Sequence, residues 1–345
     1  MTLQRKKRAT LRDVAARANV STAVVSYVIN RGPRPTSPEV RDRVLAAIAE
    51  LDYHPNGFAR GLRARRTHTI GFVTNDYHPL ESMSSHYLAS ILNVLVTELK
   101  RRGYYLLLYP LMIGEDLAAL EDLLRGGRLD GLFLRLIQDP PATDDLLTLV
   151  TEADIPCICI ERPADPRFGL TGVTYDDAGG ASLATHHLFA KGHRRIAHLQ
   201  GDVRYATALA RLTGYKQALH ECGLPIDERL IRVADWSMSE AAAALDDLLQ
   251  LDDPPTAVFA ASDDMALGVL ERLRALGRRV PEDFAIVGFD GIPLTQDVTP
   301  PLTTIRVPFN EIGRRAAELL LGGAHHTADG TPVVLPVELI EAQSA

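Results

Sequence analysis

Five segments that we predict to be buried strands are each followed directly by polar or charged side chains. Carboxylates, amides and hydroxyls can hydrogen bond to a small polar ligand, and two carboxylates could also act as acid and base in the hydrolysis of a sugar. Ligands of open parallel sheets lie beyond the carboxyl ends of the strands, so we expect these side chains to converge on one cleft. They are Asn75 and Asp76, Glu161 and Arg162, Gln200 and Asp202, Ser262 and Asp263, and Asp290.

A second group of chemically suggestive residues lies near the start of the chain. Ser21 can cap a short helix whose apolar residues Val24, Val25 and Val28 face inward, so that the other residues of its first turns face solvent. Outward side chains near the start of such a helix can reach base edges in a DNA groove. Here they are Thr22, Ala23, Ser26 and Tyr27.

Two further short helices are expected to flank that one. Thr10 can cap the first, with Asp13 three residues on, and Asn19 suits the left-handed turn that ends it. Ser37 and Pro38 mark the start of the third helix. This trio fits a DNA-reading module, and it fits a plain three-helix packing unit equally well.

The charge distribution favours the DNA-reading interpretation. Residues 1–66 contain 14 Lys and Arg against 5 Asp and Glu, a net charge of +9, whereas residues 67–345 contain 23 basic and 39 acidic residues, a net charge of −16. A protein that binds a polyanion concentrates its cations in this way, because neutralising phosphates releases counterions. A solvated basic tail at 4–8 does not explain the cations beyond it, which include Arg31, Arg34, Arg41, Arg43, Arg60, Arg63, Arg65 and Arg66.

The segment 55–63, PNGFARGLR, has the features of a hinge. It is too short and too rich in glycine to form a stable helix alone, since isolated helices under about 12 residues are marginal. We therefore expect it to fold on DNA. The alternative is a flexible linker with one buried leucine.

The rest of the chain alternates short apolar runs with amphipathic helical segments, which is typical of parallel sheets covered on both faces. So many strands exceed one sheet, and we predict an α/β core of two doubly wound lobes with a break near residue 173. The expected strands are TIGFVT (69–74), YYLLLY (104–109), GLFL (131–134), PCICI (156–160), RIAHLQ (195–200), AVFAA (257–261) and FAIVG (284–288).

Other kinds of chemistry have little support in the sequence. The chain contains no GxSxG, HExxH, Walker A or GxGxxG motif, which weakens an enzymatic interpretation. The three cysteines lack zinc-site spacing and an evident disulfide partner, and the histidine pairs at 186–187 and 325–326 are weak grounds for a metal, so we expect neither metal nor cofactor. We expect no membrane segment and a cytoplasmic location, because no secretory h-region or long apolar run is evident.

Eight blocks of the chain carry a resemblance to a known family. They are LRDVAARANVS, VVSYVIN, RVLAAIAELDYHPNGFARGL, THTIGFV, KGHRRIAHL, PPTAVFAASDDMALG, VPEDFAIVGFD and PPLTTIRVP. In this order they resemble the lactose-repressor (LacI/GalR) family of bacterial transcription regulators. The resemblance implies an all-α helix-turn-helix headpiece and a periplasmic-binding-protein-like core. The implied boundaries are 1–54 for the headpiece, 55–66 for the hinge, 67–173 and 306–325 for the first lobe, and 174–305 and 326–345 for the second lobe.

The resemblance also implies the contacts with DNA. The outward residues of the second helix would read the major groove, although many members have arginine where this chain has Tyr27, so the operator sequence stays open. Paired hinge helices of a dimer would enter the minor groove, with Leu62 as a wedge between base steps. The predicted DNA-binding set is Thr22, Ala23, Ser26, Tyr27, Asn56, Leu62 and Arg63.

The family's effector contacts map onto Glu161, Arg211, Trp236, Asp263 and Asp290, and Asn75 completes our predicted effector set. Carboxylates and an arginine that bond hydroxyls, beside an indole on which a pyranose can lie, form a sugar site. Plainer alternatives are that the two aspartates cap helices or loops and that the tryptophan belongs to the core. The chain departs from the family at 262, where serine replaces the usual asparagine, and in the loop 75–86, which lacks the frequent Asn-Pro-Phe.

We therefore expect a sugar-responsive transcriptional regulator, in its simplest form a repressor released by its ligand. It should bind double-stranded, pseudo-palindromic operator DNA as a homodimer, since the chain ends at LIEAQSA without the leucine heptads of tetrameric members. A nucleobase or another metabolite is the rival effector. A sugar hydrolase is a further alternative, and the headpiece argues against a transport binding protein.

Overall fold

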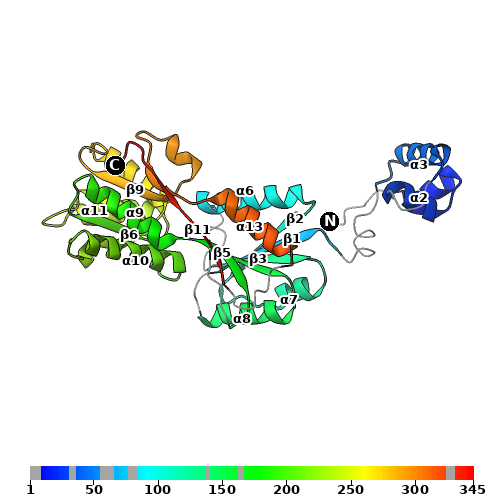
Figure 1. Cartoon of the computed structure of the whole chain (residues 1–345), viewed down its shortest axis with the longest axis horizontal. Helices are drawn as coiled ribbons and strands as arrows, with labels where there is room; N and C mark the ends of the chain where they lie inside the picture. The colour runs from blue at the N-terminus through cyan, green and yellow to red at the C-terminus, as the bar shows by residue number, and fades with distance from the viewer. Residues whose placement is uncertain are drawn as a thin grey trace, which may run out of the picture. The chain divides into compact units, whose positions relative to one another are not determined.

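The computed structural model describes residues 9–30, 36–54, 66–76, 84–136, 140–161, 167–323 and 331–345. The chain forms two compact units, Met1–Thr67 and His68–Ala345, which we call the headpiece unit and the effector core (Figure 1). The predicted hinge residues Asn56, Leu62 and Arg63 lie outside the described residues, as does Arg162.

The headpiece unit contains three helices, α1 (Leu11–Ala18), α2 (Thr22–Asn30) and α3 (Pro38–Glu50). The predicted capping box of α1 is confirmed: the backbone N of Thr10 donates to Asp13 Oδ2 at 2.7 Å, and Asp13 N donates to Thr10 Oγ1 at 3.3 Å. Asn19 ends α1 with a left-handed φ of 51°, as predicted. Ser37 Oγ accepts a hydrogen bond from Val40 N at the start of α3, so its predicted capping role is also confirmed.

One apolar residue from each helix is completely buried in the headpiece core. These residues are Val14, Val25 and Val44, and Ile48 and Leu51 pack against them from the side. The inward stripe predicted from the periodicity therefore holds the three helices together. It also fixes which side of α2 faces solvent.

The effector core contains two six-stranded sheets, one in each lobe. The first lobe's sheet is wholly parallel, in the order β11 (Val333–Leu335), β5 (Thr171–Tyr175), β4 (Cys157–Ile160), β3 (Gly131–Leu136), β1 (Thr69–Asp76), β2 (Tyr105–Met112). The second lobe's sheet is in the order β12 (Glu338–Ile340), β10 (Thr303–Arg306), β9 (Ala285–Asp290), β8 (Ala257–Ala260), β6 (Ile196–Gln200), β7 (Ile231–Val233), and only β12 is antiparallel. The predicted pair of doubly wound lobes is confirmed.

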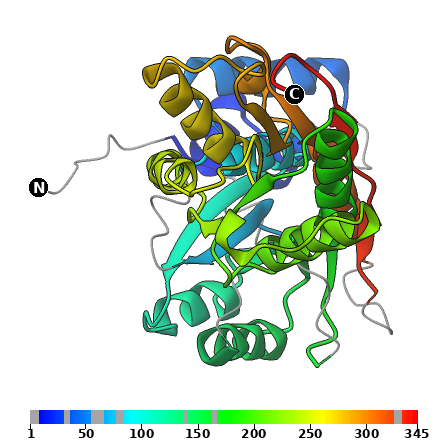
Figure 2. The ribbon, with the colours of Figure 1, turned by 90° about the vertical axis from the view of Figure 1, so that its left-hand side faces the viewer.

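Helices cover both faces of each sheet. In the first lobe, α6 (His86–Arg101) and α13 (Phe309–Leu321) cover one face, and α7 (Ala118–Arg125) and α8 (Pro140–Glu152) cover the other (Figure 1). In the second lobe, α9 packs on α10 and α11 packs on α12 (Figure 2). Their bounds are Asp177–Ala190, Ala206–Glu221, Met238–Leu249 and Asp263–Ala275, and two short 3₁₀ turns occupy Glu228–Leu230 and Pro293–Gln296.

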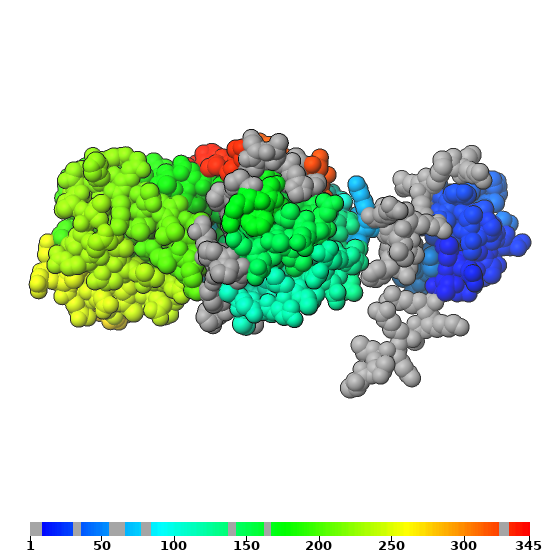
Figure 3. Space-filling model, turned by 90° about the horizontal axis from the view of Figure 1, so that it is seen from below, coloured from blue at the N-terminus to red at the C-terminus, as the bar shows by residue number. Residues whose placement is uncertain are grey.

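The chain passes between the lobes at three places, and two details of the predicted boundaries are wrong. The first lobe continues through β5 to Tyr175, so the break follows residue 175 rather than 173. The segment 326–345 does not belong wholly to the second lobe, because β11 pairs with β5 in the first and β12 pairs with β10 in the second. Red atoms from the end of the chain lie where the two lobes meet (Figure 3).

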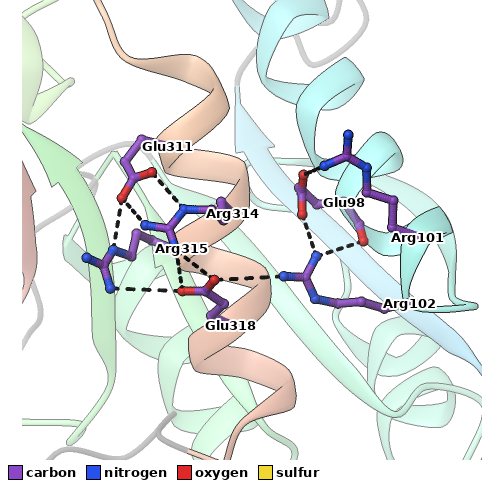
Figure 4. A network of polar contacts seen from close by, with 7 residues as sticks. All are labelled: Glu98, Arg101, Arg102, Glu311, Arg314, Arg315 and Glu318. Carbon is purple, nitrogen blue, oxygen red and sulfur yellow. Dashed lines mark hydrogen bonds and ion pairs between the residues drawn. The ribbon is translucent and has the colours of Figure 1, made fainter.

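A network of charged side chains joins α6 to α13 on the surface of the first lobe (Figure 4). Arg102, which follows the last residue of α6, contacts Glu98 on α6 and Glu318 on α13, the latter at 4.0 Å. Glu318 also accepts from Arg314 at 2.7 Å. The two helices can approach closely because Gly313 has no side chain there; an added Cβ would lie 3.0 Å from the side chain of Val94. The network therefore connects α6 to α13, the helix that follows the second passage of the chain between the lobes.

None of the helices in the described residues combines the length and the apolar character that a bilayer span needs.

Candidate functional site

A cavity of about 390 Å³ lies between the lobes of the effector core. Residues at the carboxyl ends of strands line it from both sides, as expected for open α/β sheets. Of the predicted effector residues, Glu161, Arg211, Trp236 and Asp290 line the cavity. Asp76, Asp202 and Ser262 from the first group of polar residues line it as well.

Asp263 lies beneath the cavity rather than in its wall, which corrects the sequence prediction. Its carboxylate accepts hydrogen bonds from Thr304 Oγ1 at 2.6 Å and from Ile292 N at 2.9 Å, and it is fully buried. Burial raises its pKa to about 7. Asp263 thus links β10 to the loop that follows β9. This structural role resembles the alternative given above, in which the aspartate caps a helix or a loop.

Asn75 is the second predicted effector residue outside the cavity. Successive side chains of a strand point to opposite faces, so Asn75 and Asp76 cannot both face the same space. Asp76 lines the inter-lobe cavity, whereas Asn75 lines a separate hollow of about 180 Å³ beside Leu111 and Leu117. Gln200 is buried and does not line the inter-lobe cavity either.

Arg211 is the central cation of the cavity wall. Its Nε donates to Asp177 Oδ1 at 2.8 Å, and one of its terminal nitrogens donates to Tyr175 Oη at 3.0 Å. The other contacts Asp290 Oδ1 at 3.5 Å, and the guanidinium lies 3.7 Å from the centre of the Phe289 ring. Because Tyr175 belongs to the first lobe, Arg211 of α10 also links the two lobes.

Four cavity residues have a backbone conformation that side chains rarely adopt. The φ angles are 64° at Glu161, 43° at Asp235, 61° at Trp236 and 120° at Asp290. Such strain persists only where the surrounding fold imposes it, and it concentrates at functional sites. Burial raises the pKa of Asp290 well above its usual value, and the neighbouring Arg211 opposes that shift.

Two buried polar atoms of the cavity residues have no hydrogen-bond partner among the described residues. Glu161 accepts from Arg135 Nε through Oε2 at 2.9 Å, but its Oε1 accepts nothing. The indole Nε1 of Trp236 donates to nothing. Buried polar groups are rarely left unpaired, so these two atoms mark where a bound molecule would supply partners.

Sequence reasoning missed several residues that complete the cavity. Arg135 stands inside an apolar strand, GLFLRL, and that exception was the one available signal. Two contacts cross between the lobes: His86 Nδ1 to Asp264 Oδ1 at 2.6 Å, and the Tyr205 hydroxyl to Asp76. These pairings depend on how the lobes face one another, which periodicity does not reveal.

The predicted DNA-reading residues lie on the solvent side of α2. Thr22 and Ala23 are exposed, and Ser26 and Tyr27 are half-buried, whereas Val28 packs inward. Backbone N of Val24 donates to Ser21 Oγ at 3.4 Å, which is the predicted cap.

The described part of the chain contains no cluster of three or more side chains suited to a metal ion. His186 contacts Ser182 and Glu221, and His193 contacts Thr256 Oγ1 at 2.8 Å. The pair at 325–326 lies outside the described residues.

Comparison with known proteins gives two family matches. Residues 10–56 match the model for bacterial regulatory proteins of the lacI family, and residues 185–345 match the periplasmic binding protein-like domain. The HTH-type transcriptional regulator CelR of Thermobifida fusca is 37% identical over 345 residues, spanning 99% of this chain and 100% of the relative. The HTH-type transcriptional repressor CytR of Escherichia coli (strain K12) is 34% identical, spanning 91% of this chain and 89% of the relative.

Solved structures with the same fold cover nearly the whole chain. A complex of the transcriptional regulator CelR with cellobiose has a TM-score of 0.73 and 35% identity, covering 98% of this chain and 100% of that one. The lac repressor dimer bound to operator and the anti-inducer ONPF has a TM-score of 0.83 and 27% identity, covering 98% of this chain and 99% of that one. Headpiece, core and full-length relatives agree, and the chain belongs to the lacI family of bacterial regulatory proteins.

Proposed function

We propose that this protein is a DNA-binding transcriptional repressor that occupies a pseudo-palindromic operator as a homodimer and is released by a small carbohydrate bound in the inter-lobe cavity. The observation that carries the ligand part is the pair of unsatisfied atoms, Glu161 Oε1 and Trp236 Nε1. Glu161 Oε1 can accept a hydrogen bond and Trp236 Nε1 can donate one, and the hydroxyl groups of a sugar can both donate and accept.

The cavity also suits a sugar in size and composition. Its volume of about 390 Å³ falls in the range of small-molecule sites, and carboxylates, hydroxyls and aromatic rings all line it. A relative with 35% identity is described in complex with cellobiose, which supports a carbohydrate over a nucleobase. The effector set that we now propose is Glu161, Arg211, Trp236 and Asp290, with Arg135 and Asp76 added and Asn75 and Asp263 left out.

For DNA, we assign major-groove readout to Thr22, Ala23, Ser26 and Tyr27, which lie on the outward side of α2. Minor-groove contacts are assigned to Asn56, Leu62 and Arg63 by resemblance alone. A single headpiece offers little surface for specific affinity, and a dimer doubles it. Such a regulator acts in the cytoplasm, where the DNA is.

We assign no enzymatic activity and no cofactor. Of the six carboxylates among the described lining residues, Glu161, Asp202 and Asp290 each accept a hydrogen bond from a guanidinium group. That arrangement favours fixed hydrogen-bond acceptors over a carboxyl group that must release a proton.

Selection of bound duplexes from a random pool tests the DNA part of this proposal. We expect a two-fold symmetric motif, recovered from a complex of two chains. The selected duplex, labelled with a fluorophore, then serves to screen cellobiose and other small sugars for release. A nucleobase that releases the duplex, where no sugar does, would replace the ligand class and leave the repressor assignment intact.

A further inference from the structure

The cavity walls contain more negative than positive groups. Among the described lining residues, six carboxylates face three guanidinium groups. The carboxylates are Asp76, Glu161, Asp202, Asp235, Asp264 and Asp290. The excess remains even if Asp290, whose pKa is raised by burial, holds a proton.

Each of the three guanidinium groups is already paired with a carboxylate. Arg135 donates to Glu161 at 2.9 Å, and Arg204 Nε donates to Asp202 Oδ2 at 2.6 Å. Arg211 donates to Asp177 at 2.8 Å. An anionic ligand would have to displace one of these carboxylates, and the displaced group would remain close by as a like charge.

Resting on the proposed sugar effector, we infer that the site selects an uncharged carbohydrate and rejects phosphorylated or carboxylated sugars of the same size. Glu161 sets this selectivity, because it occupies Arg135 through Oε2 and leaves Oε1 to accept a ligand hydroxyl. A neutral hydroxyl satisfies that oxygen without disturbing the ion pair. A phosphate group cannot satisfy Glu161 Oε1, because it has little or no hydrogen to donate at neutral pH. Its negative charge would also be repelled by the excess of carboxylates in the cavity wall.

The size of the discrimination follows from burial. Glu161 and Arg135 both have side chains that are only about a tenth exposed, at 7% and 11%, so water screens their charges poorly. Juxtaposed like charges in such surroundings lower affinity strongly. We expect a charged analogue to bind at least about tenfold more weakly than the matched neutral sugar.

The test uses the full chain and matched probes. Trp236 is the only tryptophan, so its fluorescence reports cavity binding directly, and release of labelled operator reports the response. The probes are cellobiose, maltose, lactose and sucrose, each beside a 6-phosphate derivative, and cellobiose beside cellobionic acid. We expect one or more neutral sugars to bind and their charged partners to bind at least about tenfold more weakly.

Glu161→Gln tests the assigned residue. It keeps the shape of the side chain and leaves Arg135 without its carboxylate, so the preference for neutral over phosphorylated sugar should fall about tenfold. Asp202→Asn, which removes the partner of Arg204, gives a second variant if the first does not fold. The matched control is Asp246→Asn: Asp246 pairs with Arg272 at 2.8 Å outside the cavity, and its loss should leave the preference unchanged.

The outcomes separate this inference from the proposed function. A phosphorylated or acidic sugar that binds as tightly as its neutral partner overturns the neutral-ligand inference and leaves a sugar-responsive repressor. An unchanged preference in both Glu161→Gln and Asp202→Asn overturns the role of the paired arginines. If no carbohydrate of either kind binds, the sugar effector itself is wrong, and the inference falls with it.

Discussion

Gly201 lies directly against the indole ring of Trp236, and a Cβ at position 201 would overlap the six-membered part of that ring. The ring also meets Tyr205 edge-on, with centroids 5.8 Å apart. The indole of Trp236 can take this orientation because Gly201 leaves room for it, and the ring of Tyr205 packs against it. The position of its Nε1 in the cavity depends on both neighbours.

Gly201→Ala should therefore weaken effector binding although Trp236, the residue proposed to contact the ligand, is not itself replaced. The added methyl group forces the indole to move, and misplacing a buried donor costs about 1 to 3 kcal/mol, or roughly 10- to 100-fold in affinity. Calorimetry with the best sugar measures this directly, with Trp236→Ala as the reference for complete loss of the ring. Equal sugar affinity in Gly201→Ala and the parent protein would show that the indole position does not matter.

Leu62→Ala should reduce specific binding far more than non-specific binding. A wedge between base steps is realised only on a kinked operator, and random DNA offers no such site. Parallel titrations of operator and random duplex, at several salt concentrations, give both affinities. A loss of the same size on both duplexes would reject the wedge assignment.

Tyr27→Arg should change the preferred half-site. The side chain lies on the outward side of α2, and an arginine there can bond a guanine in the major groove. Arg5→Ala or Lys6→Ala is the contrast, since removal of a tail cation should weaken all sequences alike. Recovery of the parent motif by Tyr27→Arg in a binding-site selection would show that this residue does not read bases.

His198 should make the effector core less stable as the pH falls. Its ring is fully buried, stacks between Tyr215 and Phe259, and has a pKa lowered to about 4 by that burial. Above pH 6.5 the ring is neutral in both folded and unfolded chains. Between pH 6.5 and 4 only the unfolded chain takes up the proton, so stability decreases by roughly 3 kcal/mol over this range.

The comparison for this prediction is His198→Phe, which keeps a stacked ring and cannot titrate. As the pH is lowered from 6.5 to 4, the free energy of unfolding should decrease more in the parent protein than in His198→Phe. Denaturant titrations of both proteins at matched pH values measure it. A constant difference across that range would mean that His198 does not couple to folding.

The sequence predicted the elements far better than the relations between them. The caps at Thr10 and Ser37 and the long apolar strands depend on local residue order, which periodicity records directly. The expected strands did not include β7, β11 and β12, which have only three residues each, too few to show a pattern. They also did not include β5 (TGVTY) and β10 (TTIR), which lack the continuous apolar run of the strands that were predicted. The third crossing between the lobes was missed with β11 and β12.

The site shows the same division. Glu161 and Asp290 line one cavity as expected, because residues at strand ends meet at one edge of a sheet. Arg211 and Trp236 line the same cavity, but only the family resemblance indicated them, since Arg211 lies within α10 and Trp236 in a loop. Asn75 was misplaced because the alternation of a strand sends neighbouring residues to opposite faces. Asp263 was misplaced because its carboxylate accepts hydrogen bonds from Thr304 and Ile292, two partners that are distant in sequence.

The most direct test of the account is the release of labelled operator by a sugar, compared between the parent protein and Asp290→Asn. Asp290 belongs to the cavity and not to the headpiece unit, so operator affinity without sugar should be unchanged. The sugar concentration for half-release should rise roughly 10- to 100-fold, as expected for a lost buried acceptor. Release at the same concentration in both proteins, or loss of operator binding in the absence of sugar, would contradict a repressor controlled from this cavity.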